Sequence, residues 1–107
     1  AEERFKFYTD LFSQNLLTEY KKITIKDPRS RWGSCSSDGS IMYSWRLAMT
    51  SDDILSYVAA HEVSHLIYFN HSVAFWAQVE DLYGDYRRPR QWLKKNGGNL
   101  HLYDFKT

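Results

Sequence analysis

The chain has 107 residues, of which 43% are hydrophobic and 17% aromatic, and its formal net charge is +1. This length predicts one domain with one core, and the near-neutral charge excludes a general attraction to nucleic acid or membrane surfaces. The only cysteine, Cys35, excludes an internal disulfide, and no apolar run reaches membrane-spanning length, so we expect a cytoplasmic protein without a membrane partner.

The first part of the chain predicts one helix and one strand. Apolar residues recur near helical spacing over residues 2–20, which predicts a helix. Residues 23–25 lie between basic residues and are followed by Asp27-Pro28, a pattern that predicts a short strand. Residues 31–36 are expected to form a loop or an irregular strand.

A second strand and three helices are predicted in the rest of the chain. Asp38-Gly39 predicts a hairpin turn, and the alternation over residues 41–49 predicts the strand that follows it. Ser51 and Ser72 precede helical patterns and are candidate caps. The elements indicate an α+β fold, in which helices pack on a small, mostly antiparallel sheet. The helices are expected at about residues 52–69, 73–83 and 86–96, the last ending at Gly97-Gly98.

The sequence His61-Glu62-Val63-Ser64-His65 falls on the helix expected at residues 52–69. Histidines four residues apart point in the same direction on a helix, so both imidazoles can bind one metal ion, and Glu62 can reach the open side of that ion. This helix is apolar on most sides and is expected to be central and buried. A metal ion with a bound water would satisfy the buried polar groups together. In the alternative interpretation, the histidines form ordinary core hydrogen bonds and the glutamate forms a salt bridge.

A third metal ligand is expected after the helix. His71 lies six residues after His65, the interval found in the H-E-x-x-H-x-x-G-x-x-H zinc motif, although Tyr68 stands where that motif has glycine. Asn70 tolerates the left-handed conformation that ends helices, so we predict that a turn at Asn70 brings His71 back to the metal. Glu80 on the next helix is the alternative ligand, because thermolysin-like sites use a carboxylate there.

Three neutral histidines around Zn²⁺ predict a hydrolytic centre. Such an ion acidifies a bound water and polarises a carbonyl or phosphoryl oxygen. Glu62 is the expected general base, because it can take the proton of that water and pass it to the leaving group. A further donor for the oxyanion is expected. Tyr86 is the first candidate, Arg46 and Tyr68 are the others, and packing or a surface position is the alternative role of each.

Three other features have both a functional and a structural interpretation. Residues 40–49 form either an edge strand that pairs with an extended substrate or an ordinary strand of the sheet. Cys35 is either an inhibitory zinc thiolate or an inert buried thiol. A basic cluster in the last predicted helix either binds phosphate or DNA or is a solvated helix face. Its members are Arg87, Arg88, Arg90, Lys94 and Lys95.

Five short motifs follow one another along the chain: Arg31-Trp32-Gly33-Ser34-Cys35-Ser36, Trp45-Arg46-Leu47, His61-Glu62-Val63-Ser64-His65, Asn70-His71-Ser72 with Phe75-Trp76, and Asp85-Tyr86 with Trp92-Leu93-Lys94. In this order they resemble the YgjP-like metallopeptidase domain over about residues 23–100. The resemblance implies a zincin fold, similar to that of the SprT and WLM proteases, with zinc on His61, His65 and His71 and with Glu62 as general base. It also implies that the chain, which begins with Ala rather than Met, is a fragment lacking an N-terminal β-rich region.

Three functions are consistent with these observations. The first is a zinc metallopeptidase acting on a peptide or protein substrate, which for the SprT and WLM proteases is attached to DNA. The second is a zinc-dependent nucleotide pyrophosphatase, because one member of the resembled family is described as acting on UTP; the basic cluster would then bind the triphosphate. The third is a metal-stabilised binding module without turnover, against which Glu62 argues, because a structural site needs no base. No oligomeric state is predicted.

Overall fold

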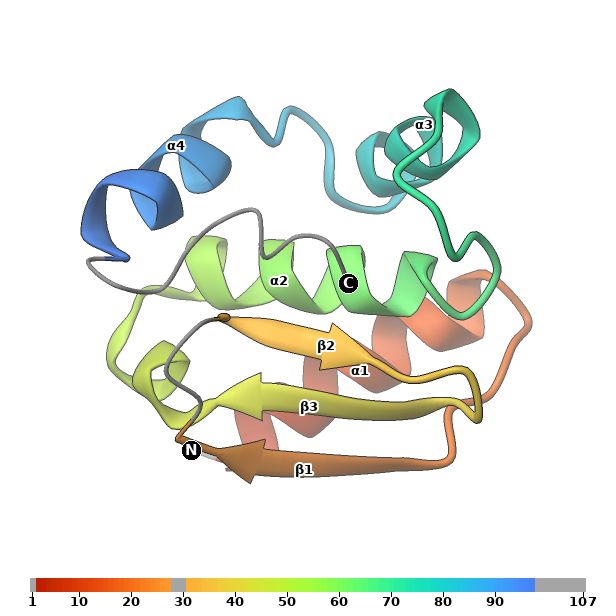
Figure 1. Cartoon of the computed structure of the whole chain (residues 1–107), viewed down its shortest axis with the longest axis horizontal. Coiled ribbons are helices and arrows are strands. Elements are labelled where there is room, and N and C mark those ends of the chain that lie inside the picture. The colour runs from red at the N-terminus through yellow and green to blue at the C-terminus, as the bar shows by residue number, and fades with distance from the viewer. Residues whose placement is uncertain (1, 28–30, 98–107) are drawn as a thin grey trace.

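The computed structural model describes residues 2–27 and 31–97; His101, to which the sequence assigned no role, lies outside them. The fold is α+β, as predicted. In chain order the elements are helix α1 (Glu2–Asn15), strands β1 (Lys22–Lys26), β2 (Gly33–Cys35) and β3 (Ser40–Ser44), the 3₁₀ helix η1 (Trp45–Met49), and helices α2 (Asp52–Ser64), α3 (Val73–Tyr83) and α4 (Arg87–Asn96) (Figure 1).

The three strands form one mixed sheet in the order β1-β3-β2. β3 lies in the middle, parallel to β1 and antiparallel to β2. The sheet is therefore not mostly antiparallel, and the interpretation of residues 40–49 as an edge strand is wrong, because β3 is paired on both sides. The edge of the sheet next to α2 belongs to β2 (Figure 1).

The predicted hairpin turn joins β2 to β3. Gly39 has a φ of 91°, a left-handed value that glycine adopts without strain, and its N–H donates to the Ser36 carbonyl oxygen at 3.0 Å. The Asp38 carboxylate accepts a further hydrogen bond from the Ser40 N–H at 3.0 Å. This tight connection keeps β2 and β3 in register and leaves the other side of β3 for β1.

β3 ends at Ser44, so the strand expected over residues 41–49 is too long. The Ser44 hydroxyl accepts a hydrogen bond from the Arg46 N–H at 3.2 Å and caps the first turn of η1. Leu47 is buried in this turn, while Trp45 is exposed. The alternation of apolar and polar residues that predicted a strand up to residue 49 is therefore also compatible with the short helix η1, which begins after the cap at Ser44.

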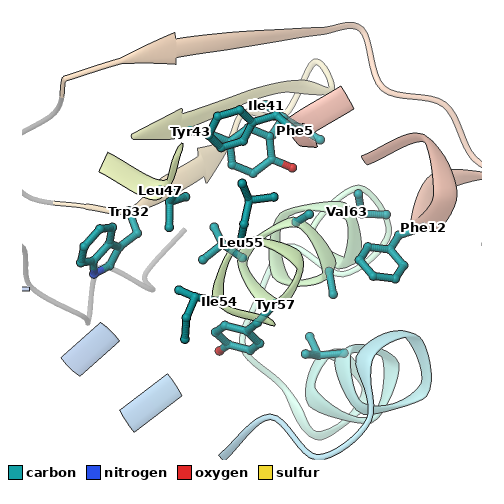
Figure 2. Close-up of a cluster of buried hydrophobic side chains, with 14 of the residues drawn as sticks. Phe5, Phe12, Trp32, Ile41, Tyr43, Leu47, Ile54, Leu55, Tyr57 and Val63 are labelled. Atoms are coloured by element: carbon teal, nitrogen blue, oxygen red, sulfur yellow. The ribbon is translucent and has the colours of Figure 1, made fainter. Parts of the chain in front are cut away.

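α2 is the centre of the fold. The sheet lies on one side of it, and α3 and α4 lie on the other (Figure 1). Every residue from Ile54 to Ser64 is buried, which confirms a central buried helix carrying the H-E-x-x-H motif. Figure 2 shows apolar side chains of the surrounding core. Buried members from the other elements include Phe5 and Phe12 of α1, Ile41 and Tyr43 of β3, Leu47 of η1, Phe75 and Val79 of α3, and Leu93 of α4.

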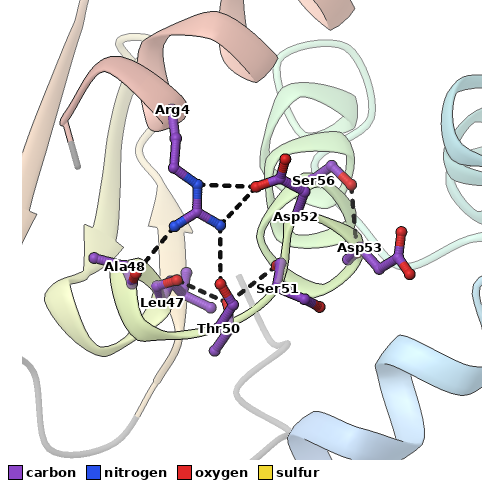
Figure 3. Close-up of polar contacts among 8 residues, drawn as sticks. All are labelled: Arg4, Leu47, Ala48, Thr50, Ser51, Asp52, Asp53 and Ser56. Carbon is purple, nitrogen blue, oxygen red and sulfur yellow. Dashed lines mark hydrogen bonds and ion pairs between the residues drawn. The ribbon is translucent and has the colours of Figure 1, made fainter.

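Arg4 of α1 fixes the beginning of α2 (Figure 3). Its Nε donates to the Asp52 carboxylate at 2.9 Å, and its two terminal nitrogens donate to the Ala48 and Thr50 carbonyl oxygens at 3.0 and 2.9 Å. Ser51, the predicted cap, occupies the N-cap position without a side-chain hydrogen bond. The arginine therefore links α1, η1 and the first turn of α2.

α1 ends at Asn15 rather than near residue 20. Leu17 takes a left-handed φ of 53°, and the Thr18 N–H returns to the Ser13 carbonyl oxygen at 3.0 Å, as at many helix ends. α3 has the predicted bounds, and α4 begins one residue later than predicted. None of the helices in the described ranges is long and apolar enough to cross a membrane.

Candidate metal centre

Three histidine side chains meet at the end of α2. His61 and His65 lie one turn apart on α2 and are buried, and the half-buried His71 reaches them from the loop before α3. One ring nitrogen from each histidine lies within 4.8 Å of a ring nitrogen of the other two. Nitrogen atoms this close can bind one metal ion after small side-chain movements. The three histidines therefore form a group that can hold a metal.

The ring of His65 is oriented for metal binding. Its Nδ1 lies 2.9 Å from the Tyr68 carbonyl oxygen, so a neutral ring donates there and presents the lone pair of Nε2 to the site. This Nε2 lies 3.2 Å from His71 Nε2, and two nitrogens on a tetrahedral zinc ion are about 3.3 Å apart. Burial lowers the pKa of His65 to about 4, so the ring is neutral at neutral pH, as a metal ligand must be.

Aromatic side chains in the first turn of α3 pack against the imidazoles. The Phe75 ring stacks on His65 with centroids 4.4 Å apart, and the Trp76 ring stacks on His71 at 5.8 Å. Ser72 caps this turn as predicted, because its hydroxyl accepts a hydrogen bond from the Phe75 N–H at 3.2 Å. The start of α3 therefore sets the positions of two of the histidine rings.

The chain reaches His71 through an earlier turn than predicted. α2 ends at Ser64, and the Tyr68 N–H donates back to the Ser64 carbonyl oxygen at 2.9 Å. Asn70 does not have a positive φ, so the left-handed turn expected there is wrong. The early turn has a second effect, because it places the Tyr68 carbonyl oxygen against the imidazole of His65.

Glu62, between the two histidines of α2, is fully buried. Neither of its carboxylate oxygens has a hydrogen-bond partner within the described residues. Burial raises the pKa of Glu62 well above its ordinary value, and the charge of Arg31 acts in the opposite direction. A buried carboxylate without a partner is unfavourable. A positive ion and a water held by the histidines would supply what it lacks, so these residues fit a metal centre.

Gly33 of β2 leaves room for this carboxylate. A Cβ atom at residue 33 would lie 3.0 Å from Glu62 Oε2, 3.1 Å from the Met42 carbonyl oxygen and 3.2 Å from Val58 Cγ1. These distances are shorter than ordinary van der Waals contacts, so a larger residue would displace a neighbour. No role for Gly33 was predicted from the sequence, although a glycine inside a strand can mark the close approach of another group.

Tyr86, the first candidate for an oxyanion donor, lines a groove that His71 also lines. The groove has a volume of about 420 Å³, and Trp76, Glu80 and Arg90 also line it. Tyr86 is half-buried at the N-cap of α4, and its ring lies 5.0 Å from that of Trp76. It therefore forms part of a surface next to the candidate metal ligands.

The other two candidates for the oxyanion donor have contacts of their own. Arg46 forms an ion pair with Asp27 at 3.1 Å, and its guanidinium lies over the Trp45 ring. Tyr68 is half-buried against the core, and its backbone binds the imidazole of His65. Neither residue is among those that line the groove at His71.

Two further sequence candidates lie near the histidines without joining them. Glu80 is exposed on α3 and is not part of the metal-ligating group found in the described ranges. The structure therefore brings His71, rather than Glu80, to the two histidines of α2. Cys35 is a half-buried thiol whose pKa burial raises to about 12. It is protonated at neutral pH, which favours the inert thiol over the inhibitory thiolate.

Comparison with known proteins assigns the chain to a family. The YgjP-like, metallopeptidase domain family matches residues 1–96. The chain belongs to this family. Membership confirms the resemblance carried by the five motifs. A search of curated proteins finds no significant match to this chain.

The fold of this YgjP-like domain also occurs in a solved structure. The crystal structure of the metallopeptidase zymogen of Pyrococcus abyssi abylysin matches with a TM-score of 0.79 and 16% sequence identity, covering 91% of this chain and 98% of that chain. At this identity the likeness concerns the fold alone. It confirms the α+β architecture.

Proposed function

We propose that this domain is a zinc metallopeptidase, in which His61, His65 and His71 hold the ion and Glu62 is the general base. The observation that carries the proposal is the pairing of a convergent histidine group with a buried carboxylate that has no hydrogen-bond partner among the described residues. A structural zinc site needs no such carboxylate. Membership of a metallopeptidase family supports peptide or protein as the substrate class.

A bound zinc ion would supply an acidified water and a Lewis acid for the scissile carbonyl. Glu62 accepts a proton from the attacking water and delivers it to the amine that leaves. The same burial that raises its pKa in the metal-free protein keeps bulk water from competing for this proton. A positive charge beside it favours the ionised form that a base requires. Tyr86 is proposed as the donor to the oxyanion, since it lines the same groove as His71.

The edge of β2 is proposed as the place where substrate backbone binds. β2 is an edge strand of the sheet, it lies next to α2, and its Gly33 lies beside Glu62. An extended peptide added to such an edge gains backbone hydrogen bonds that do not depend on its sequence. This role replaces the one expected for residues 40–49.

The identity of the third ligand is tested with two single variants. We expect His71→Ala to reduce bound zinc sharply, because it removes one of three nitrogens, and Glu80→Gln to keep one zinc per chain. Elemental analysis of purified protein after dialysis against zinc-free buffer measures this. The reverse result would show a site of two histidines and one glutamate.

The reaction is tested by two assays with and without a chelator. We expect chelator-sensitive cleavage of casein or a peptide library and no release of pyrophosphate or phosphate from UTP. Glu62→Gln should retain zinc and lose about 10²–10⁴-fold in turnover, because an amide cannot accept the proton. Release of pyrophosphate or phosphate from UTP without peptide cleavage would replace the peptidase by a nucleotide hydrolase. Unchanged turnover in Glu62→Gln would show that Glu62 is not the general base.

A further inference from the structure

The basic residues of α4 differ in their surroundings. Arg90 lines the groove at His71, and it is the only arginine or lysine among the described residues that does so. Arg87 is paired with Asp85 at 2.8 Å. Arg88 lines a different cavity, near the start of α2. The cluster is therefore not one uniform charged face, and of its five members, all within the described ranges, Arg90 alone lines the groove at His71.

An aromatic ring, rather than a carboxylate, holds Arg90 in place. Its guanidinium carbon lies 4.6 Å from the centre of the Trp76 ring, which is a cation–π contact. In the part of the chain that the structure describes, its side chain forms no ion pair. A guanidinium that rests on a ring keeps N–H groups available at its edge, and these can donate two parallel hydrogen bonds to a carboxylate.

The charge of Arg90 lies close to His71, because the ring of Trp76 contacts both side chains. The Trp76 ring stacks on His71 with centroids 5.8 Å apart. The distance from this imidazole to the guanidinium is then at most the span of about three extended residues. A peptide held at the histidines and running along the groove would therefore reach Arg90 within three residues of the bond that is cut.

Glu80 adds a negative charge to the same groove. The hydrogen bonds that Arg87 donates to the Asp85 carboxylate are the main cause that raises the pKa of Arg87, and the charge of Glu80 acts in the same direction. Glu80 forms no ion pair with Arg90 in the described ranges. A carboxylate of a substrate thus has one favourable partner in the groove and one that repels it. This arrangement restricts the position that the carboxylate can occupy.

We propose that Arg90 forms a carboxylate-binding subsite that selects peptides with a negative charge within three residues of the scissile bond. The inference rests on the proposed function, because the groove is lined by His71, one of the candidate zinc ligands. The carboxylate belongs either to an Asp or Glu side chain or to the free C-terminus of a short peptide. Arg90 is thus a specificity-determining residue that does not touch the reacting atoms.

The first test measures kcat/KM for a series of peptides with the zinc-loaded protein. A neutral host peptide receives Glu or its isostere Gln at each of three positions on either side of the cut bond, and a parallel pair carries a free or an amidated C-terminus. We expect Glu, or the free C-terminus, to be preferred at one position by about tenfold or more, mainly through KM. The two arms distinguish a side-chain carboxylate from a terminal one.

Arg90 variants connect the preference to this residue. Arg90→Ala should reduce the preference to about one, and Arg90→Lys should retain part of it, because an ammonium keeps the charge without the fork of donors. Arg88→Ala is the matched control: it removes the same charge from the same helix and should keep the full preference. If Arg88→Ala loses the preference for a carboxylate as much as Arg90→Ala does, the preference comes from the overall charge of α4, and the subsite at Arg90 is overturned.

A binding measurement decides the inference even if no peptide is cleaved. Fluorescence anisotropy of labelled Glu and Gln peptides is measured with zinc-loaded Glu62→Gln protein and with its Arg90→Ala double variant. Tighter binding of the Glu peptide that disappears with Arg90 supports the subsite, whatever the reaction is. Equal affinities for the two peptides overturn it. Absence of chelator-sensitive cleavage together with selective binding would contradict the peptidase and leave the subsite in place.

Discussion

The carboxylate of Glu62 is buried without a hydrogen-bond partner among the described residues, next to histidines that can hold a metal. In the metal-free protein this arrangement is unfavourable, because a buried acceptor has lost its water and gained nothing in exchange. The side chain therefore lowers the stability of the metal-free domain at the position where we propose a general base. Replacement by an amide of the same shape separates the two effects.

We predict that Glu62→Gln raises the free energy of unfolding of the metal-free protein near pH 8 by about 1–3 kcal/mol. The folded-state pKa of Glu62 lies above the unfolded value of 4.5, so the unfolded state ionises first and the stability of the unmodified protein falls as the pH rises above that value. Glutamine does not titrate. Urea unfolding in chelator should therefore show the difference growing from about pH 5 to pH 8. A variant that is no more stable at high pH would contradict the burial argument.

Gly33 gives a second prediction at this scale. Gly33→Ala should destabilise the metal-free protein by about 1–3 kcal/mol, because the new methyl group overpacks the space against Glu62 Oε2. In the Glu62→Ala background the same change should cost less, since the nearest atom is gone. Urea unfolding of the four proteins gives the coupling, and Ser34→Ala on the same strand is the control. Additive effects would show that the contact with Glu62 is unimportant.

Local spacing made some of these residues predictable. The convergence of His61 and His65 follows from the helical repeat, and their burial follows from the apolar residues around them. The role proposed for Gly33 depends on a contact between β2 and α2, and no pattern within either segment reports it. The contact of Arg90 with Trp76 likewise joins two helices whose relative placement the sequence does not state.

At the scale of elements, α2 begins at a junction that Arg4 holds together. Three segments that are separate in sequence, α1, η1 and α2, meet at one guanidinium (Figure 3). Two of its hydrogen bonds go to the carbonyl oxygens of Ala48, in η1, and of Thr50, which lies between η1 and the first turn of α2. The junction sets where α2 starts and therefore where its last turn, with the histidines, is placed.

We predict that Arg4→Ala lowers the free energy of unfolding by about 1–2 kcal/mol, because two partly buried carbonyl oxygens lose a charged donor. Lys6→Ala on the same helix is the control. It removes an exposed pair with Asp10 and should change stability little. Thermal or urea unfolding compares the two variants. Equal effects would mean that the junction contributes no more than a surface charge.

Element ends were harder to predict than element types. The helix over residues 73–83 was predicted correctly because Ser72 forms the cap its position indicates. The strand expected over residues 41–49 and the helix expected to residue 69 were too long, since the cap at Ser44 and the early turn after Ser64 decide those ends. An apolar pattern continues through both ends, so hydrogen bonds rather than hydrophobicity stop the elements.

At the scale of the whole molecule, the domain has one core around α2 and its candidate metal centre at the end of that helix. Metal binding should therefore stabilise the entire fold. Zinc at about 100 times its Kd should add up to about 2.7 kcal/mol, and each kcal/mol raises Tm by about 4–8 °C for a domain of this size. Calcium, which prefers oxygen ligands, should not raise it. Scanning calorimetry with each ion, and with His71→Ala as a zinc-deficient control, measures this. A zinc-independent Tm would contradict the site.

The three histidines lie within the short segment of residues 61–71. A chain that has lost its tertiary structure still carries them close together, and closing so short a loop around an ion costs little conformational entropy. The denatured ensemble should therefore retain some affinity for zinc, which a site assembled from distant segments would lose. The ion would then raise Tm by less than the full mass-action value, and it could hold the end of α2 against the start of α3 before the sheet is formed. A synthetic peptide of residues 58–76 that binds zinc on its own would be the direct sign of this.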